Sequence, residues 1–226
     1  MDGHAEPARL SLDALALGTG FVLGLRHSLD PDHVAALAQF ASAEPAARRG
    51  LVFGLRWGAG HAFAVALLGA LLVPAGLGLG ARYERAAEGA VGLMLVGLAL
   101  WRLRSLIATE HVHPHRHTDG TVHSHPHRHG LGHVHAHAPT ATGFAHGLAG
   151  VVGVVALTPL VEGALGRALV LLAFAAGSLV SMGLFGAFAG RLFASLDASP
   201  KGLRAAAGVT AAAGLAVGLL WIERAL

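Results

Sequence analysis

Two imidazoles and two carboxylates lie within one short segment near the N-terminus, Arg26-His27-Ser28-Leu29-Asp30-Pro31-Asp32-His33. Imidazole and carboxylate together form a ligand set that suits first-row divalent ions such as nickel, cobalt or zinc. Pro31 has no amide hydrogen, so the carbonyl of His27 loses its helical partner. Pro31 also disfavours helical geometry at Asp30. We therefore expect a helix to open where these imidazoles and carboxylates converge.

The composition of the chain makes this polar segment informative. Of 226 residues, 54% are hydrophobic and 13% are charged, whereas roughly a quarter would be charged in a soluble domain. This balance excludes a soluble globular protein, a disordered chain and a nucleic-acid binder. There is no cysteine, which excludes disulfides and thiolate metal sites.

A charged residue at the centre of a bilayer helix costs about 2.5–3.5 kcal/mol. The polar segment must therefore pair internally, line a wet cavity or bind an ion. The alternative is an interfacial loop between two short apolar segments, with its charges in water.

Six apolar segments are long enough, at about 20 residues each, to cross a bilayer. They predict an all-α polytopic membrane protein with spans at 10–40, 50–74, 86–106, 141–163, 167–194 and 203–222, the first of them discontinuous at the polar segment. Five spans contain glycines four residues apart, which let neighbouring helices approach closely. These pairs are Gly20/Gly24, Gly54/Gly58, Gly143/Gly147, Gly186/Gly190 and Gly214/Gly218.

A histidine-rich segment divides the chain into two halves of three spans. We predict an N-terminal half at 1–107, a flexible loop without a core at 108–140, and a C-terminal half at 141–226. A shift of 123 residues aligns Gly20–Leu25 with Gly143–Leu148, Gly54 with Gly177 and Gly60 with Gly183. An odd number of spans in each half would make such repeats inverted, an arrangement common in transporters.

Basic residues in the loops predict the orientation. Nine lie on the side of the histidine-rich segment and five on the side of both termini. The positive-inside rule places the nine-residue side in the cytoplasm of a prokaryotic cell and both termini outside. Scattered as they are, these residues form no patch for a nucleic acid.

Further polar residues occur inside the predicted spans. They are Arg56 and His61 in the second span, His146 and Glu162 in the fourth, and Ser178 and Ser181 in the fifth. A single buried histidine is more often structural, and the serines suit helix-to-helix hydrogen bonds. Together with His27 and His33, however, His61 and His146 predict a shared polar pathway. Arg56 cannot ligate a cation, so we expect it to pair with Asp30 or Asp32.

These residues resemble motifs of the nickel/cobalt permeases. His27, Asp32 and His33, preceded by Arg26, match the family's His-x4-Asp-His signature. The segment Gly58–Ala62 is similar to its Gly-His-Ser motif, with Ala62 in place of serine, and Gly143–Gly150 resembles an element of the short UreH-like members. The resemblance implies that the His-x4-Asp-His residues recognise the metal within a transmembrane helix.

The chain departs from the family in two respects. Full-length members have eight spans, whereas we find six, as in the UreH-like group. The second half has no clear copy of the family's acidic Asp-Thr-Ala-Thr-Glu motif, and Glu162 is the nearest acidic candidate.

Eleven of the 16 histidines lie in the histidine-rich segment, in three groups within each of which they alternate strictly with other residues. In an extended chain, every second side chain points the same way. Neutral imidazoles so arranged would capture several metal ions weakly, while a solvated low-complexity linker is the alternative. The histidines are His111, His113, His115, His117, His123, His125, His127, His129, His133, His135 and His137.

The sequence thus favours a secondary-type permease for Ni²⁺ or Co²⁺, with the ion as cargo and no prosthetic group. No nucleotide-binding loop occurs, so an ion gradient, the membrane potential or a partner must drive transport. An efflux protein, or a non-transporting accessory protein that supplies nickel to urease or hydrogenase assembly, remains an alternative. No zinc-protease or serine-protease motif points to an enzyme. A homo-oligomer and contact with a nickel chaperone stay open.

Overall fold

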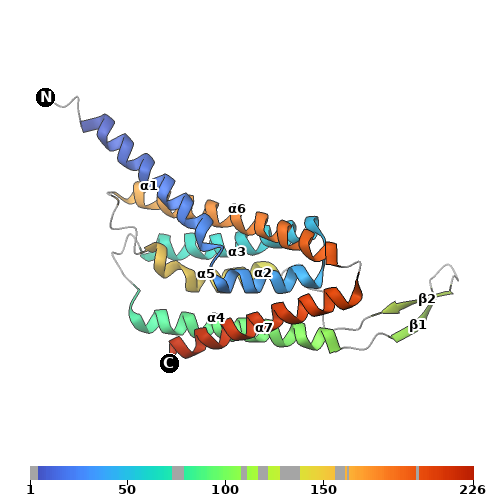
Figure 1. The fold of residues 1–226 in the computed structure, drawn as a ribbon. Coiled ribbons are helices and arrows are strands. Elements are labelled where there is room, and N and C mark those ends of the chain that lie inside the picture. The colour runs from blue at the N-terminus through green and yellow to red at the C-terminus, as the bar shows by residue number, and fades with distance from the viewer. Residues whose placement is uncertain are drawn as a thin grey trace.

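A computed structural model describes residues 5–72, 79–107, 111–116, 122–127, 138–155, 161, 163–196 and 199–226. This part of the chain forms seven helices and one two-stranded hairpin (Figure 1). The elements are α1 (Ala5–His27), α2 (Pro31–Ala43), α3 (Ala47–Leu72), α4 (Ala81–Ile107), β1 (His111–Arg116), β2 (Val122–His127), α5 (Ala138–Val155), α6 (Ala164–Leu196) and α7 (Pro200–Ala225).

Helices α2 to α7 lie roughly along one axis, α1 is inclined to them, and the hairpin projects from one end of the bundle (Figure 1). Helix α3 packs against both α6 and α5, α1 packs against α6, and α4 packs against α7. The first turn of α1 and the last turn of α7 lie at the end away from the hairpin (Figure 1). The short helix α2 lies in the interior, in contact with α7 and α6.

Four described helices are long and apolar enough to cross a membrane: α3, α4, α6 and residues Lys201–Ala225 of α7. By length and composition, the chain is therefore a polytopic integral membrane protein. The predicted first span corresponds to α1 followed by α2. The predicted fourth span corresponds to α5 as far as Val155, and most of its remainder lies outside the described residues.

The predicted opening of the first span is confirmed. Helix α1 ends at His27, and α2 begins at Pro31. Asp30 has an extended backbone (φ −63°, ψ 147°) and precedes the proline at the first position of α2. Pro31 is suited to that position because the first amide groups of a helix have no intrahelical partner.

Close helix packing at the paired glycines is also confirmed. At nine of the ten glycines of the five predicted pairs, an added Cβ would come within 3.0 Å of a neighbouring helix, and at Gly190 it would come that close to Ala46, just before α3. Gly24 approaches the carbonyl of Phe174, and Gly54 approaches that of Met182. These contacts bring backbones together where no hydrophobic effect drives association.

The histidine-rich segment differs from the predicted flexible loop because it contains two paired strands. Strands β1 and β2 are antiparallel, and their register places His111 opposite His127, His113 opposite His125 and His115 opposite His123. Strict alternation over six residues is the period of an extended strand. The sequence pattern was therefore compatible with pairing, even though it offers no hydrophobic core.

Candidate metal site

Four helices bring histidines to one place in the bundle. His27 is the last residue of α1, His33 lies in the first turn of α2, His61 lies in the middle of α3, and His146 lies in α5. The break between α1 and α2 places two of these histidines at helix ends. The close approach of α3 and α5 brings in the other two. All four predicted intramembrane histidines thus converge.

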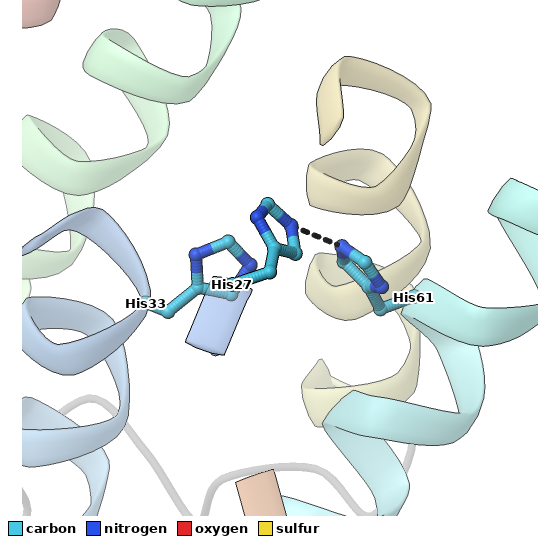
Figure 2. Close-up of side chains that lie close together, drawn as sticks. All are labelled: His27, His33 and His61. Carbon is cyan, nitrogen blue, oxygen red and sulfur yellow. Dashed lines mark hydrogen bonds between the residues drawn. The ribbon is translucent and has the colours of Figure 1, made fainter. Parts of the chain in front are cut away.

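His27 lies between a carboxylate and a second imidazole. Its Nδ1 lies 3.1 Å from Asp30 Oδ2, and its Nε2 lies 3.3 Å from His61 Nε2. Figure 2 shows His27 between His33 and His61, with the contact between the nitrogens of His27 and His61 drawn as a dashed line. The Asp30 side chain is 47% exposed, so this end of the site is open.

Asp32 connects two further imidazoles in the buried part of the site. Its Oδ1 lies 3.2 Å from His33 Nδ1, and its Oδ2 lies 2.9 Å from His146 Nε2. Both carboxylate oxygens therefore have a histidine partner. The side chains of Asp32, His33 and His146 are all buried.

These residues form two overlapping groups of potential metal ligands. His27, His33 and His61 make one, Asp32, His33 and His146 make the other, and each offers ligand atoms within 4.8 Å of one another. Around a tetrahedral ion with bonds of about 2.0–2.1 Å, ligand atoms lie roughly 3.3–3.4 Å apart. The nitrogens of His27 and His61 already have that separation.

Several buried nitrogens in this cluster have no hydrogen-bond partner among the described residues. They are His33 Nε2, His61 Nδ1 and His146 Nδ1. An unsatisfied buried polar group costs about 1–3 kcal/mol. Coordination of an ion would compensate such a cost, so the chemistry of the donor set fits a divalent transition metal.

Gly150 forms one wall of the site. A Cβ at this position in α5 would lie 3.1 Å from both His27 Nε2 and His61 Nε2. The glycine thus leaves room next to the two nitrogens that face each other. Gly150 belongs to the motif at Gly143–Gly150, but only the three-dimensional approach of α5 reveals its role in the site.

Two predicted arginines lie away from the histidines. Arg26 and Arg56 are both exposed. The expected pairing of Arg56 with Asp30 or Asp32 is wrong, since neither described carboxylate forms an ion pair with it. Five residues along an α-helix rotate a side chain by about 140°, so Arg56 and His61 face different sides of α3.

Both predicted serines lie at buried positions of α6. Ser178 Oγ donates to the carbonyl of Gly24 at 3.2 Å, and Ser28 Oγ donates to the carbonyl of Ser178 at 3.0 Å. Ser178 thus ties α6 to the end of α1, and Ser181 is also buried in α6. Glu162 lies outside the described residues, as do the side chains of the histidine-rich segment.

Two aromatic residues near the histidines were not predicted. The ring of Phe174 lies 5.3 Å from that of His27, and the ring of Trp57 lies 5.6 Å from that of His146. Both are buried. Trp57 precedes His61 by one helical turn, a spacing that places two side chains on one face of a helix. This spacing was the signal in the sequence that Trp57 lies near the site.

Comparison with known proteins supports the resemblance seen in the motifs. The chain is 32% identical over 176 residues to the urease accessory protein UreH of Bacillus sp. (strain TB-90). The match covers 76% of this chain and 75% of the relative. No family model matches the sequence, and no solved structure matches it. Identity at this level over three quarters of both chains shows that the protein belongs to the UreH family, the short group that its motifs resemble among the nickel/cobalt permeases.

Proposed function

We propose that this protein carries Ni²⁺ or Co²⁺ across the cytoplasmic membrane. The observation that carries the proposal is the pair of potential ligand groups that share His33. They lie at the break between α1 and α2, inside a bundle of apolar helices. Ionisable groups inside a membrane bundle are costly and typically mark ion pathways. The name of the UreH relative connects that protein to urease, a connection that favours nickel as the cargo.

His27, His33 and His61 would form the first ligand set. His27 and His33 each place Nδ1 against a carboxylate, Asp30 and Asp32 respectively. A carboxylate at one ring nitrogen fixes the tautomer and makes the other nitrogen a better ligand. His27 and His33 would then bind the ion through Nε2, so that Asp30 acts mainly by orienting His27.

His33 belongs to both ligand groups, which supports a two-step path. An ion would enter at the half-exposed Asp30 end, bind between His27 and His61, and move to the group of Asp32, His33 and His146. At the second position Asp32 would act as a direct ligand, and its negative charge would offset part of the charge of the cation. Arg26, Arg56, Ser178, Ser181 and Glu162 are not needed as ligands in this scheme.

An inverted relationship between the halves would let the site open to either side. Gly20 and Gly24 of α1 approach the carbonyls of Val170 and Phe174 in α6. The aligned Gly143 and Gly147 of α5 approach the carbonyls of Trp57 and His61 in α3. The equivalent contacts support six spans arranged as two inverted three-span halves.

The same contacts favour a different alignment for the second helix of each half. They make Phe174 the counterpart of His61, rather than aligning Gly54 with Gly177. The position equivalent to His27 is then Gly150. The ion site would be asymmetric, with three imidazoles from the first half and one from the second.

The histidine-rich segment would act as an auxiliary site on the cytoplasmic side. Its paired strands place histidines at opposed register positions, and opposed residues of an antiparallel pair have Cβ atoms about 4.5–5.5 Å apart. Weak capture of several ions next to the bundle would hold metal close to the transport path. Supply of nickel to urease assembly, with no enzymatic step by this chain, is the accessory role that the relative's name favours.

The decisive experiment measures uptake of radioactive nickel by proteoliposomes that contain only this protein. We expect uptake by the wild-type protein and none by His27→Ala or Asp32→Ala. Asp30→Asn should weaken the apparent affinity by about 10–100-fold, as expected when a residue orients a ligand.

Glu84→Ala is the matched control, because it removes an exposed carboxylate from α4 away from the site. It should transport normally. Undiminished uptake in both His27→Ala and Asp32→Ala would refute the site. Tight nickel binding without any flux would instead favour a non-transporting accessory protein. Nickel sensitivity of a deletion strain would identify export, and loss of urease activity would identify import.

A further inference from the structure

A cavity of about 380 Å³ lies at the end of the bundle where α2 ends and α3 and α5 begin. It opens to the surface and does not belong to the metal site. Phe40, in its wall, packs against Trp57, whose ring packs in turn against His146. Its lining includes Phe40, Glu44, Arg48, Arg49, Val52, Phe53, Arg56 and Pro139.

The polar part of this cavity is strongly basic. Arg48, Arg49 and Arg56 contribute three guanidinium groups, and among the described residues Glu44 is the only carboxylate in the lining. The contact from Arg49 Nη1 to Glu44 Oε2 is long at 3.8 Å, and both side chains are at least half exposed. A cavity with this excess of positive charge disfavours a metal cation and favours an anion.

Helix ends add to the positive charge. Arg48 and Arg49 lie in the first turn of α3, and Pro139 lies in the first turn of α5. Neither first turn contains an acidic residue. The N-terminus of a helix carries partial positive charge and is stabilised by anions, so an anion bound here would interact with both arginines and with the helix end.

The C-terminus of α2 offers limited compensating negative charge, because two of its last carbonyls already accept hydrogen bonds. The buried Arg102 donates through Nη2 to the carbonyl of Ser42 and through Nε to its hydroxyl. The amide of Glu44 donates to the carbonyl of Phe40. Part of the negative charge of this helix end is therefore used within the bundle.

The remaining wall of the cavity is apolar. Phe40, Val52 and Phe53 line it, and Val52 is exposed on α3 beside the exposed Leu51 and Leu55. Arginine forks bind phosphate through paired charge-assisted hydrogen bonds, and the apolar wall suits an acyl chain. We propose that this cavity binds the phosphate headgroup of an anionic phospholipid. The site rests on its own residues and is independent of metal transport.

The test is native mass spectrometry of the full-length protein released from detergent micelles. The probes are phosphatidylglycerol, phosphatidylcholine and inorganic phosphate, each added separately. We expect retention of phosphatidylglycerol by the wild-type protein. The combined Arg48→Gln, Arg49→Gln and Arg56→Gln variant should bind it at least about tenfold more weakly, given the strength of hydrogen bonds between charged groups.

Arg82→Gln with Arg85→Gln is the control, because both arginines are exposed at the opposite end of the bundle. It should retain the lipid, and the elution volume in size-exclusion chromatography should show that each variant is folded. Equal retention by the triple variant and the control would overturn the proposal. So would equal retention of phosphatidylcholine, or binding of inorganic phosphate without phosphatidylglycerol.

Discussion

The space between His27 and His61 is set by a residue that has no side chain. Gly150 faces the Nε2 atoms of both histidines. A methyl group there would lie in tight contact with the two nitrogens and would occupy the volume of the proposed ion site. Gly150 therefore contributes to the site by leaving it open.

Replacing Gly150 with alanine should weaken nickel binding while the bundle stays folded. We expect a loss of affinity of about tenfold or more, the effect of losing 1.4 kcal/mol of binding energy or more. Alanine also favours a helix by about 1 kcal/mol over glycine, so the thermal stability should not fall greatly. Isothermal titration with NiCl₂ measures the affinity.

Gly97→Ala is the matched control, since a Cβ at Gly97 in α4 would meet no atom within 4 Å. This variant should bind nickel as the wild-type protein does. Equal affinity of the two variants would show that the space next to Gly150 is not the binding volume.

Residues of the candidate site could be predicted where burying their polar side chains in a membrane span costs free energy. Imidazoles and carboxylates inside apolar segments need an explanation, and this requirement alone is enough to select His27, Asp32, His61 and His146. Gly150 and Phe174 are ordinary in an apolar helix, so nothing local selects them, and Trp57 is marked only by its position one helical turn before His61. The predicted pairing of Arg56 with Asp30 or Asp32 failed because Arg56 lies on a different face of α3 from His61. Two residues of one span do not have to face the same site.

At the level of the helices, reciprocal glycine contacts determine where His27 lies. Gly24 of α1 approaches the carbonyl of Phe174, and Gly177 of α6 approaches the carbonyl of Phe21. Ser28 and Ser178 add hydrogen bonds across the same crossing. Because His27 ends α1, a small change in this crossing moves its imidazole.

Gly177→Val should therefore damage both stability and metal binding. A side chain at Gly177 would clash with the backbone of α1, and overpacking of this kind costs about 1–3 kcal/mol. The melting temperature in detergent and the nickel affinity should both fall.

Gly18→Val provides the comparison, because a Cβ at Gly18 in α1 has open space around it. It should leave the nickel affinity unchanged. If Gly177→Val binds nickel normally, the α1–α6 crossing does not position His27.

Helix boundaries and helix partners differ in how far local signals determine them. Pro31 predicted the break between α1 and α2 because a missing amide acts locally. The glycine pairs predicted that helices approach closely, but they did not predict which helices. A helix surface made of small residues can pack against many different partners. The hairpin was missed because alternation without an apolar face does not reveal whether an extended chain finds a pairing strand.

At the scale of the whole molecule, α4 runs from one end of the bundle to the other (Figure 1). Gly80 precedes α4 at the end near the termini, and Ile107 ends it near the hairpin. Both are exposed, and Ile107 is 80% exposed. The chain has no native cysteine, so a single introduced cysteine reports its own position without background.

Gly80→Cys and Ile107→Cys should therefore respond oppositely to a membrane-impermeant maleimide. The bias of nine basic residues to five predicts that Gly80 lies outside and Ile107 lies in the cytoplasm. We expect Gly80→Cys to be labelled in intact cells and Ile107→Cys only after permeabilisation. Reversed labelling would invert the orientation but keep α4 as a span, and it would put the histidine-rich segment outside the cell. Labelling of both cysteines in intact cells would mean that α4 does not cross the membrane, and the two-half arrangement that exposes the metal site to each side would fail with it.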